Sequence, residues 1–178
     1  MKTRHLIAML LKASGGDISG KTKLQKELYF LSQRLGLDLG YRAHHYGPYS
    51  TDVDQALDEL IGAGFVQVDE EVYGIDYYRG FEMKRYDYRL TESGEKLVEK
   101  LISEYSDVYS KVQEFAQKLK DIGDPDYLRL SLAAKFHYVQ SRGSGRLSED
   151  DIIKEASKFG WNVDVGCAVD ILGKLKPA

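Results

Sequence analysis

The sequence predicts an α+β fold that is mainly helical, and three observations support this prediction. Between residues 3 and 61, apolar side chains recur every three or four positions, which is the spacing of amphipathic helices. Residues 65–73 and 81–90 instead alternate apolar and polar side chains, are rich in Val, Tyr and Phe, and flank a turn from Gly74 to Gly80. Beyond residue 91 the helical spacing returns. We therefore expect three helices, a two-stranded hairpin and a helical carboxy-terminal part.

Composition limits the class of protein. The chain of 178 residues is 43% hydrophobic and 30% charged, which is enough apolar material to fill a core. No apolar run approaches the roughly 20 residues that cross a bilayer, and the amino end lacks the features of a signal peptide, so we expect a cytoplasmic protein. The single cysteine, Cys167, lies in an apolar stretch, which favours a small buried side chain over a reactive thiol.

The first two helices are expected over residues 3–13 and 21–35. Residues 14–17 interrupt the pattern, Ser19 or Gly20 can cap the second helix, and Gly36 ends it. One side of the second helix is apolar and should face the core, and it consists of Leu24, Leu28, Leu31 and Leu35. Roughly the opposite side carries Lys23, Lys26, Phe30 and Arg34. We interpret this second side as a basic face.

The third helix is expected to begin near Ser50 or Thr51, after the turn-rich and aromatic segment 40–50, and to end at Gly62 or Gly64. Its exposed arc is acidic and consists of Thr51, Asp52, Asp54, Gln55, Asp58 and Glu59. The charge along the chain is uneven. Residues 1–50 hold eight Lys/Arg against three Asp/Glu, a net +5, whereas residues 51–75 hold seven Asp/Glu and no Lys/Arg, a net −7.

One long helix is expected from residue 91 to residue 122, followed by three shorter helices after Pro125. Its apolar seam alternates spacings of four and three and consists of Leu101, Tyr105, Val108, Val112, Phe115, Leu119 and Ile122. Such a seam packs along another helix, either of this chain or of a second copy, and we predict a homodimer. The expected domains are a hairpin-bearing domain over residues 1–91 and a helical region over residues 92–178.

The segment GGDISGKT, residues 15–22, matches the spacing of a phosphate-binding loop. Such a loop needs a buried strand before it and a helix after it, because backbone N–H groups at the helix start hold the phosphates. The preceding residues are helical and the strand-like runs form a hairpin. We interpret the segment as an inter-helix turn and helix cap, with no cofactor, and Lys21 as a candidate contact for a DNA phosphate.

Three helices followed by a hairpin is the order that a winged helix-turn-helix requires. The segments KTKLQKELYFL, HHYGPYS, DQALDELIGAGFV and RLTESGEKLVEKL together resemble the YwgA-like group of uncharacterised bacterial and archaeal winged-helix proteins, and more distantly the Panacea domain of antitoxins. The resemblance covers about residues 3–100. It implies a winged-helix fold and a regulatory or interaction role.

Two functions are consistent with this pattern. The first is a DNA-binding transcriptional regulator that touches phosphates through the second helix and the wing, because the acidic third helix would repel them. Its candidate contacts are Lys21, Lys23, Lys26, Arg34, Arg42, His44, His45, Arg79, Lys84 and Arg85. The second is a protein-interaction module, antitoxin-like or an adaptor, that engages a basic partner. Its candidate contacts are Tyr46, Tyr49, Asp54, Asp58 and Glu59.

Other chemistry has little support in the sequence. His44 and His45 are adjacent, so their side chains usually point apart, and no cysteine or regularly spaced carboxylate joins them as a metal ligand. His5 and His137 lie far away along the chain, each within an expected helix. No nucleophile or paired carboxylate stands in a recognisable catalytic arrangement. We expect neither a metal nor an enzyme activity.

Overall fold

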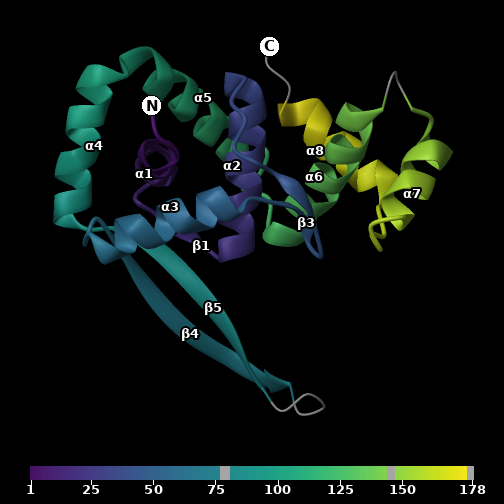
Figure 1. The fold of residues 1–178 in the computed structure, drawn as a ribbon, viewed down its shortest axis with the longest axis horizontal. Helices are drawn as coiled ribbons and strands as arrows, with labels where there is room; N and C mark the ends of the chain where they lie inside the picture. The colour runs from purple at the N-terminus through teal and green to yellow at the C-terminus, as the bar shows by residue number, and fades with distance from the viewer. Residues whose placement is uncertain (77–80, 144–146, 176–178) are drawn as a thin grey trace.

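The structure, a computed structural model, describes residues 1–76, 81–143 and 147–175. Within these residues the chain is mainly helical and carries a small antiparallel sheet, which confirms the predicted α+β class. No helix in these three segments combines the length and the apolar character that a membrane span would need. A long hairpin projects from the helical body (Figure 1).

The amino-terminal half contains three helices and a three-stranded sheet. The helices are α1 (Thr3–Ser14), α2 (Lys21–Leu35) and α3 (Thr51–Gly62). The sheet has the order β1-β5-β4, with β1 (Asp17–Ser19), β4 (Val66–Asp76) and β5 (Phe81–Leu90). All pairings are antiparallel, with Ile18 opposite Tyr88 and Val66 opposite Leu90. The predicted hairpin is confirmed, whereas β1 was expected to be part of a turn.

Strand β1 corrects the interpretation of the GGDISGKT segment. The strand lies inside this segment, after Gly15 and Gly16, and not before it as a phosphate-binding loop requires. Gly20 then starts α2 with a φ of 93°, a left-handed conformation that glycine tolerates best. The segment therefore closes an edge of the sheet against β5 and launches α2.

A second, shorter hairpin lies between α2 and α3. It consists of β2 (Arg42–His44) and β3 (Gly47–Tyr49), which the sequence pattern did not predict. Ser50 then caps α3, as expected, by accepting a hydrogen bond from the Val53 backbone N–H at 3.1 Å. Gln25 of α2 holds the same residue through both backbone groups, at 2.9 Å and 3.1 Å. This pair of bonds fixes the start of α3 against α2.

The expected single helix over residues 91–122 is wrong, because Tyr105 breaks it. The two parts are α4 (Glu92–Glu104) and α5 (Ser106–Asp121), and Tyr105 between them has φ −128° and ψ 45°. Figure 1 shows α4 and α5 as an arch around α1. A straight helix of that length would extend about 45 Å, far past the roughly 18 Å of α1. The break therefore lets both apolar faces contact the same helix.

The apolar seam packs within the chain. Val112, Phe115 and Leu119 are buried, and α5 lies along α1 and α2. This confirms the intrachain alternative for the seam. A homodimer would have to use another surface.

The carboxy-terminal part consists of further helices, and the first of them covers the other side of α2. These helices are α6 (Tyr127–Arg142), α7 (Glu149–Ser157) and α8 (Val165–Leu175). Helix α6 packs against α2, β3 and α8, so one hydrophobic cluster includes residues from both halves of the chain. Cys167 at the start of α8 is partly exposed and not buried as expected.

Candidate functional site

Lys26 is buried inside the protein. Its exposed fraction is 1%, and its Nζ donates a hydrogen bond to the backbone carbonyl of Pro48 at 2.8 Å. Gly47 makes room for this contact, since a Cβ at that position would lie 3.4 Å from Lys26 Cε and 3.2 Å from Lys135 Cγ. Phe30, from the same predicted face, is buried as well. The interpretation of this side of α2 as a basic face is therefore wrong, because β3 and α6 cover it.

Burial changes the chemistry of the Lys26 amine. Loss of water, together with the positive charge of Lys135, lowers the pKa of Lys26 to about 7. A buried amine beside a neutral carbonyl and a second amine favours its uncharged form. Lys26 is thus poorly placed to contact a phosphate.

The other cations of α2 are engaged by carboxylates. Lys23 Nζ lies 2.8 Å from both carboxylate oxygens of Asp124, and Arg34 Nη2 lies 2.8 Å from Glu114. The Lys23 and Arg34 side chains are only 16% and 15% exposed. These two cations tie α2 to α5 and to the segment after it.

Lys21, the lysine of the GGDISGKT segment, pairs with the acidic third helix. Its Nζ lies 2.6 Å from Asp54 Oδ1. Both side chains are partly exposed, so the pair contributes little to stability, but it directs the amine to a carboxylate of α3.

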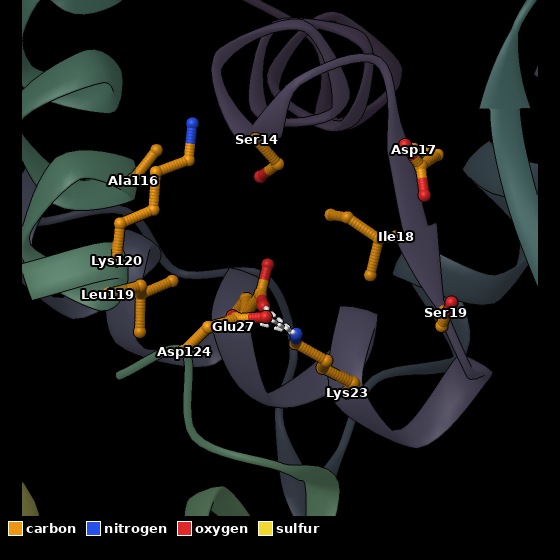
Figure 2. A pocket seen from close by; sticks show the side chains of 10 residues that line it. All are labelled: Ser14, Asp17, Ile18, Ser19, Lys23, Glu27, Ala116, Leu119, Lys120 and Asp124. Atoms are coloured by element: carbon orange, nitrogen blue, oxygen red, sulfur yellow. Dashed lines mark hydrogen bonds and ion pairs between the residues drawn. The ribbon is translucent and has the colours of Figure 1, made fainter. Parts of the chain in front are cut away.

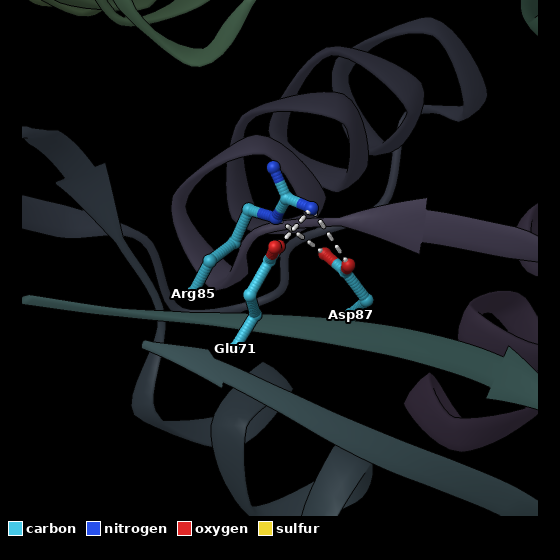
Figure 3. Close-up of polar contacts among 3 residues, drawn as sticks. All are labelled: Glu71, Arg85 and Asp87. Carbon is cyan, nitrogen blue, oxygen red and sulfur yellow. Dashed lines mark hydrogen bonds and ion pairs between the residues drawn. The ribbon is translucent and has the colours of Figure 1, made fainter. Parts of the chain in front are cut away.

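The described cations of the long hairpin also face carboxylates. Arg85 bridges Glu71 on β4, at 2.6 Å, and Asp87 on its own strand, at 3.1 Å and 3.2 Å (Figure 3). Lys84 Nζ lies 2.6 Å from Glu70. Arg79 lies outside the described residues. The predicted basic wing is therefore, over the described residues, a ladder of opposite charges across two strands.

The hairpin β2–β3 presents its predicted basic residues to solvent. Arg42, His44 and His45 are exposed. The His44 ring packs on Tyr49 at 4.9 Å between centroids, and its backbone carbonyl accepts a hydrogen bond from Trp161 Nε1 at 2.7 Å. His45 instead contacts Tyr46, whose exposed ring lies in the turn. The two histidines thus diverge, as adjacent residues were expected to do.

The exposed side of α3 is acidic, as the sequence predicted. Asp52, Asp58 and Glu59 are exposed, and Asp54 is half-buried. Glu59 pairs with Arg4 of α1 at 2.6 Å. We call the four carboxylates Asp52, Asp54, Asp58 and Glu59 the acidic α3 surface.

Two tyrosines border this surface. Burial and a hydrogen bond to Asp54 raise the pKa of Tyr49 on β3. Burial, with the negative charges of Asp54 and Asp58, raises the pKa of Tyr88 on β5 to about 12. Sequence reasoning missed Tyr88, although its place in an alternating strand was a signal available in the sequence; the structure pairs it with Ile18 of β1. The acidic α3 surface thus meets β3 and β5 along a rim of tyrosine side chains.

Comparison with known proteins shows a partial match to a bacterial protein. The chain is 33% identical over 96 residues to uncharacterized protein YwgA of Bacillus subtilis (strain 168). The match covers 53% of this chain, and the chain spans about half the length of that relative. No protein-family model matches the chain. Over about half its length, therefore, the chain is similar to YwgA, in agreement with the resemblance that its motifs indicated.

Proposed function

We propose that this chain is a winged-helix protein that uses the acidic α3 surface to bind a basic partner protein. The sheet order β1-β5-β4, with β1 between the first two helices and the long hairpin after the third, supports the winged-helix arrangement. In such a fold the third helix and the hairpin form the recognition side. Here that side presents carboxylates.

The negative charge of α3 favours a basic protein over DNA as the partner. The face of α3 that would enter a DNA groove exposes Asp52, Asp58 and Glu59, and the nearby cations Lys21 and Arg4 are already paired with this helix. Phosphates carry the same sign of charge and would be repelled. A surface rich in lysine or arginine has the complementary charge and would be steered toward α3.

The sheet order also favours a second candidate, a DNA-binding regulator. In this case the phosphates would meet the exposed Arg42, His44 and His45 on hairpin β2–β3, away from the third helix. The ion pairs of Lys23, Arg34 and Arg85 weaken this candidate, because each pair would have to open to release its cation. A homodimer, the third predicted association, would need a surface other than the α5 seam.

Charge reversal on α3 tests the proposal. Asp52→Lys with Asp58→Lys changes exposed carboxylates while leaving the Lys21–Asp54 and Arg4–Glu59 pairs intact. Glu149→Lys with Asp150→Lys on α7 makes the same charge change on exposed residues elsewhere and serves as the matched control. Tagged forms of all three chains would be purified from the native cells after nuclease treatment, and bound polypeptides quantified by mass spectrometry.

We expect a basic polypeptide to accompany the wild type and the α7 variant and to fall at least tenfold with the α3 variant. A fluorescence-anisotropy titration with mixed duplex DNA at low salt runs in parallel. Salt-sensitive DNA binding that survives or strengthens in the α3 variant, without a co-purifying polypeptide, would refute the protein-partner proposal in favour of the second candidate.

A further inference from the structure

A cavity of about 300 Å³ lies on the side of α2 that faces β1 and the end of α5 (Figure 2). This volume is at the lower end of the range of small-molecule sites. The polar lining of the cavity includes Ser14, Lys23, Glu27, Lys120 and Asp124. Ile18 and Leu119 supply apolar wall on opposite sides of the hollow (Figure 2). The cavity does not touch the acidic α3 surface.

The central feature of the cavity is a buried carboxyl, Glu27, with one oxygen that lacks a hydrogen-bond partner. The Glu27 side chain is 2% exposed, and its Oε2 has no hydrogen bond to any residue that the structure describes. Figure 2 shows this carboxyl standing within the hollow, below Ser14 and beside Lys23 and Asp124. An unsatisfied buried carboxyl oxygen has lost its bonds to water without replacing them, so its retention in a cavity needs an explanation.

Lys23 does not supply the missing bond. Its Nζ lies 2.8 Å from each oxygen of Asp124 but 3.8 Å from Glu27 Oε1, beyond hydrogen-bonding distance. The lysine is therefore committed to Asp124, which lies after α5 and is itself exposed. Glu27 is left with an open acceptor that points into a space large enough for a small molecule.

We propose that this cavity binds a small molecule through a primary ammonium group, which donates hydrogen bonds to Glu27. An ammonium carries three donors and a positive charge, the counterpart of a buried carboxylate with an open oxygen. The Ser14 hydroxyl borders the same space and can accept a further bond. Among the described residues no group of three or more His, Cys, Asp or Glu side chains is placed to hold a metal ion, which favours an amine over a metal.

Lys120 allows two kinds of amine. Its exposed amine lies on the other side of the cavity, where its recorded hydrogen bond is a long one, 3.5 Å, to the Ala13 carbonyl. A free amino acid would place its carboxylate near Lys120 and its apolar side chain on Ile18 and Leu119. A diamine would use Glu27 alone. Both kinds of ligand bind through an ammonium group, and the experiment below distinguishes the amino acid from the diamine.

Binding is expected to release a proton. Burial raises the pKa of Glu27 to about 8, Asp124 adds to the rise, and Lys23 opposes it. The other charged groups that face the cavity are Lys120 on α5 and Asp17 on β1. Because the ammonium needs the ionised carboxylate, affinity should rise up to about tenfold per pH unit below pH 8 and level off above it.

Isothermal titration calorimetry on the full chain tests the proposal. The probes are 1,4-diaminobutane, L-leucine, and 4-methylpentanoate, which has the leucine skeleton without the amine. The proteins are the wild type, Glu27→Gln, and the control Glu99→Gln, whose exposed side chain lies on α4 outside the cavity. We expect at least one amine to bind saturably, Glu27→Gln to weaken it at least tenfold, and the acid without an amine not to bind.

A second readout does not depend on the variant folding well. In the wild type, the ¹³C chemical shift of the Glu27 carboxyl should move from the protonated to the ionised value when the amine saturates the site near pH 7. The proposal fails if neither amine binds, if 4-methylpentanoate binds equally, or if Glu27 keeps its shift upon saturation. Binding of leucine and not of the diamine would identify an amino-acid site, and the reverse would identify a diamine site.

Discussion

Lys26 and Glu27 are adjacent in the sequence and are both buried, but they face different surroundings. Lys26 contacts a neutral carbonyl beneath β3, whereas Glu27 lies in the cavity on another side of α2. Burial lowers the pKa of Lys26 to about 7 and raises that of Glu27 to about 8. Near neutral pH, Lys26 is therefore partly uncharged and Glu27 is largely uncharged.

Lys26 should make the free energy of unfolding depend on pH. Its pKa is about 7 in the folded state against an ordinary value of 10.5, so the unfolded state binds the proton first as the pH falls. The free energy of unfolding therefore decreases as the pH falls from about 10.5 to about 7, and it stays at the lower value below pH 7. Lys26→Met removes this penalty but leaves the Pro48 carbonyl without its donor.

We expect Lys26→Met to be more stable than the wild type by about 2 kcal/mol near pH 6, with the gain shrinking toward pH 10. Urea denaturation at several pH values measures both free energies. Lys100→Met, at an exposed position on α4, serves as the control and should show no such trend. A gain that is constant with pH would mean that Lys26 keeps its charge in the folded protein.

At the scale of secondary structure, Gly94 determines how closely α4 approaches the end of α3. A Cβ built on Gly94 would lie 2.1 Å from the backbone carbonyl oxygen of Phe65, which no side-chain movement relieves. The helix start is fixed by Thr91, whose side chain accepts from the Gly94 N–H at 3.1 Å and donates to the Gly64 carbonyl at 2.7 Å. The first turn of α4 is thus pressed against the α3–β4 connection.

Gly94→Ala should therefore destabilise the protein by about 2–4 kcal/mol, although alanine is the better helix former by about 1 kcal/mol. Gly173→Ala in α8 is the matched control, because a Cβ at Gly173 would meet no described residue within 4 Å beyond its chain neighbours and its own helix backbone. The control should be neutral or slightly stabilising. Thermal unfolding followed by circular dichroism compares them, and equal midpoints for the two variants would contradict the steric argument.

The predictability of each element from sequence depended on its length and surroundings. Helices α1, α2 and α3 and the hairpin β4–β5 repeat their pattern often enough to be recognised. Strands β1, β2 and β3 have three residues each, too few to display an alternation. The break at Tyr105 leaves the apolar spacing uninterrupted, so the arch of α4 and α5 follows from packing on α1 and not from a local signal.

Only part of the candidate site could be predicted, because a local sequence pattern does not reveal which surfaces later segments of the chain cover. The acidic α3 surface follows from one amphipathic helix, and the sequence predicted it correctly. The sequence did not predict that the side of α2 carrying Lys26 is buried, because the helix that covers it, α6, lies about a hundred residues later in the chain. Phe30 on that side is the one sequence signal of burial, since an aromatic residue among cations indicates a face that can be buried.

At the scale of the whole molecule, the two halves share one core. The six residues Leu6–Leu11 of α1 are all fully buried, because α3, α4 and α5 pack around them. Lys12 on the same helix pairs with Glu95 of α4. The boundary near residue 91 therefore separates segments of the chain whose apolar surfaces cover one another.

A fragment of residues 1–91 should for this reason fail to fold alone. It would expose the apolar surface of α1 that α4 and α5 cover, and the faces of α2 that contact α5 and α6. We expect no cooperative thermal transition by circular dichroism and poor dispersion in a proton–nitrogen NMR spectrum. A sharp transition near that of the full chain would instead establish residues 1–91 as an independent domain.

The enclosure of α1 also has a consequence for folding during synthesis. Helix α1 is synthesised before α4 and α5, which surround it in the folded protein and are made about ninety residues later. Until they arrive, α1 remains an uncovered apolar helix on the nascent chain. In the finished protein the same enclosure should make the α1 amides among the slowest to exchange with deuterium, since their exposure requires the arch to open.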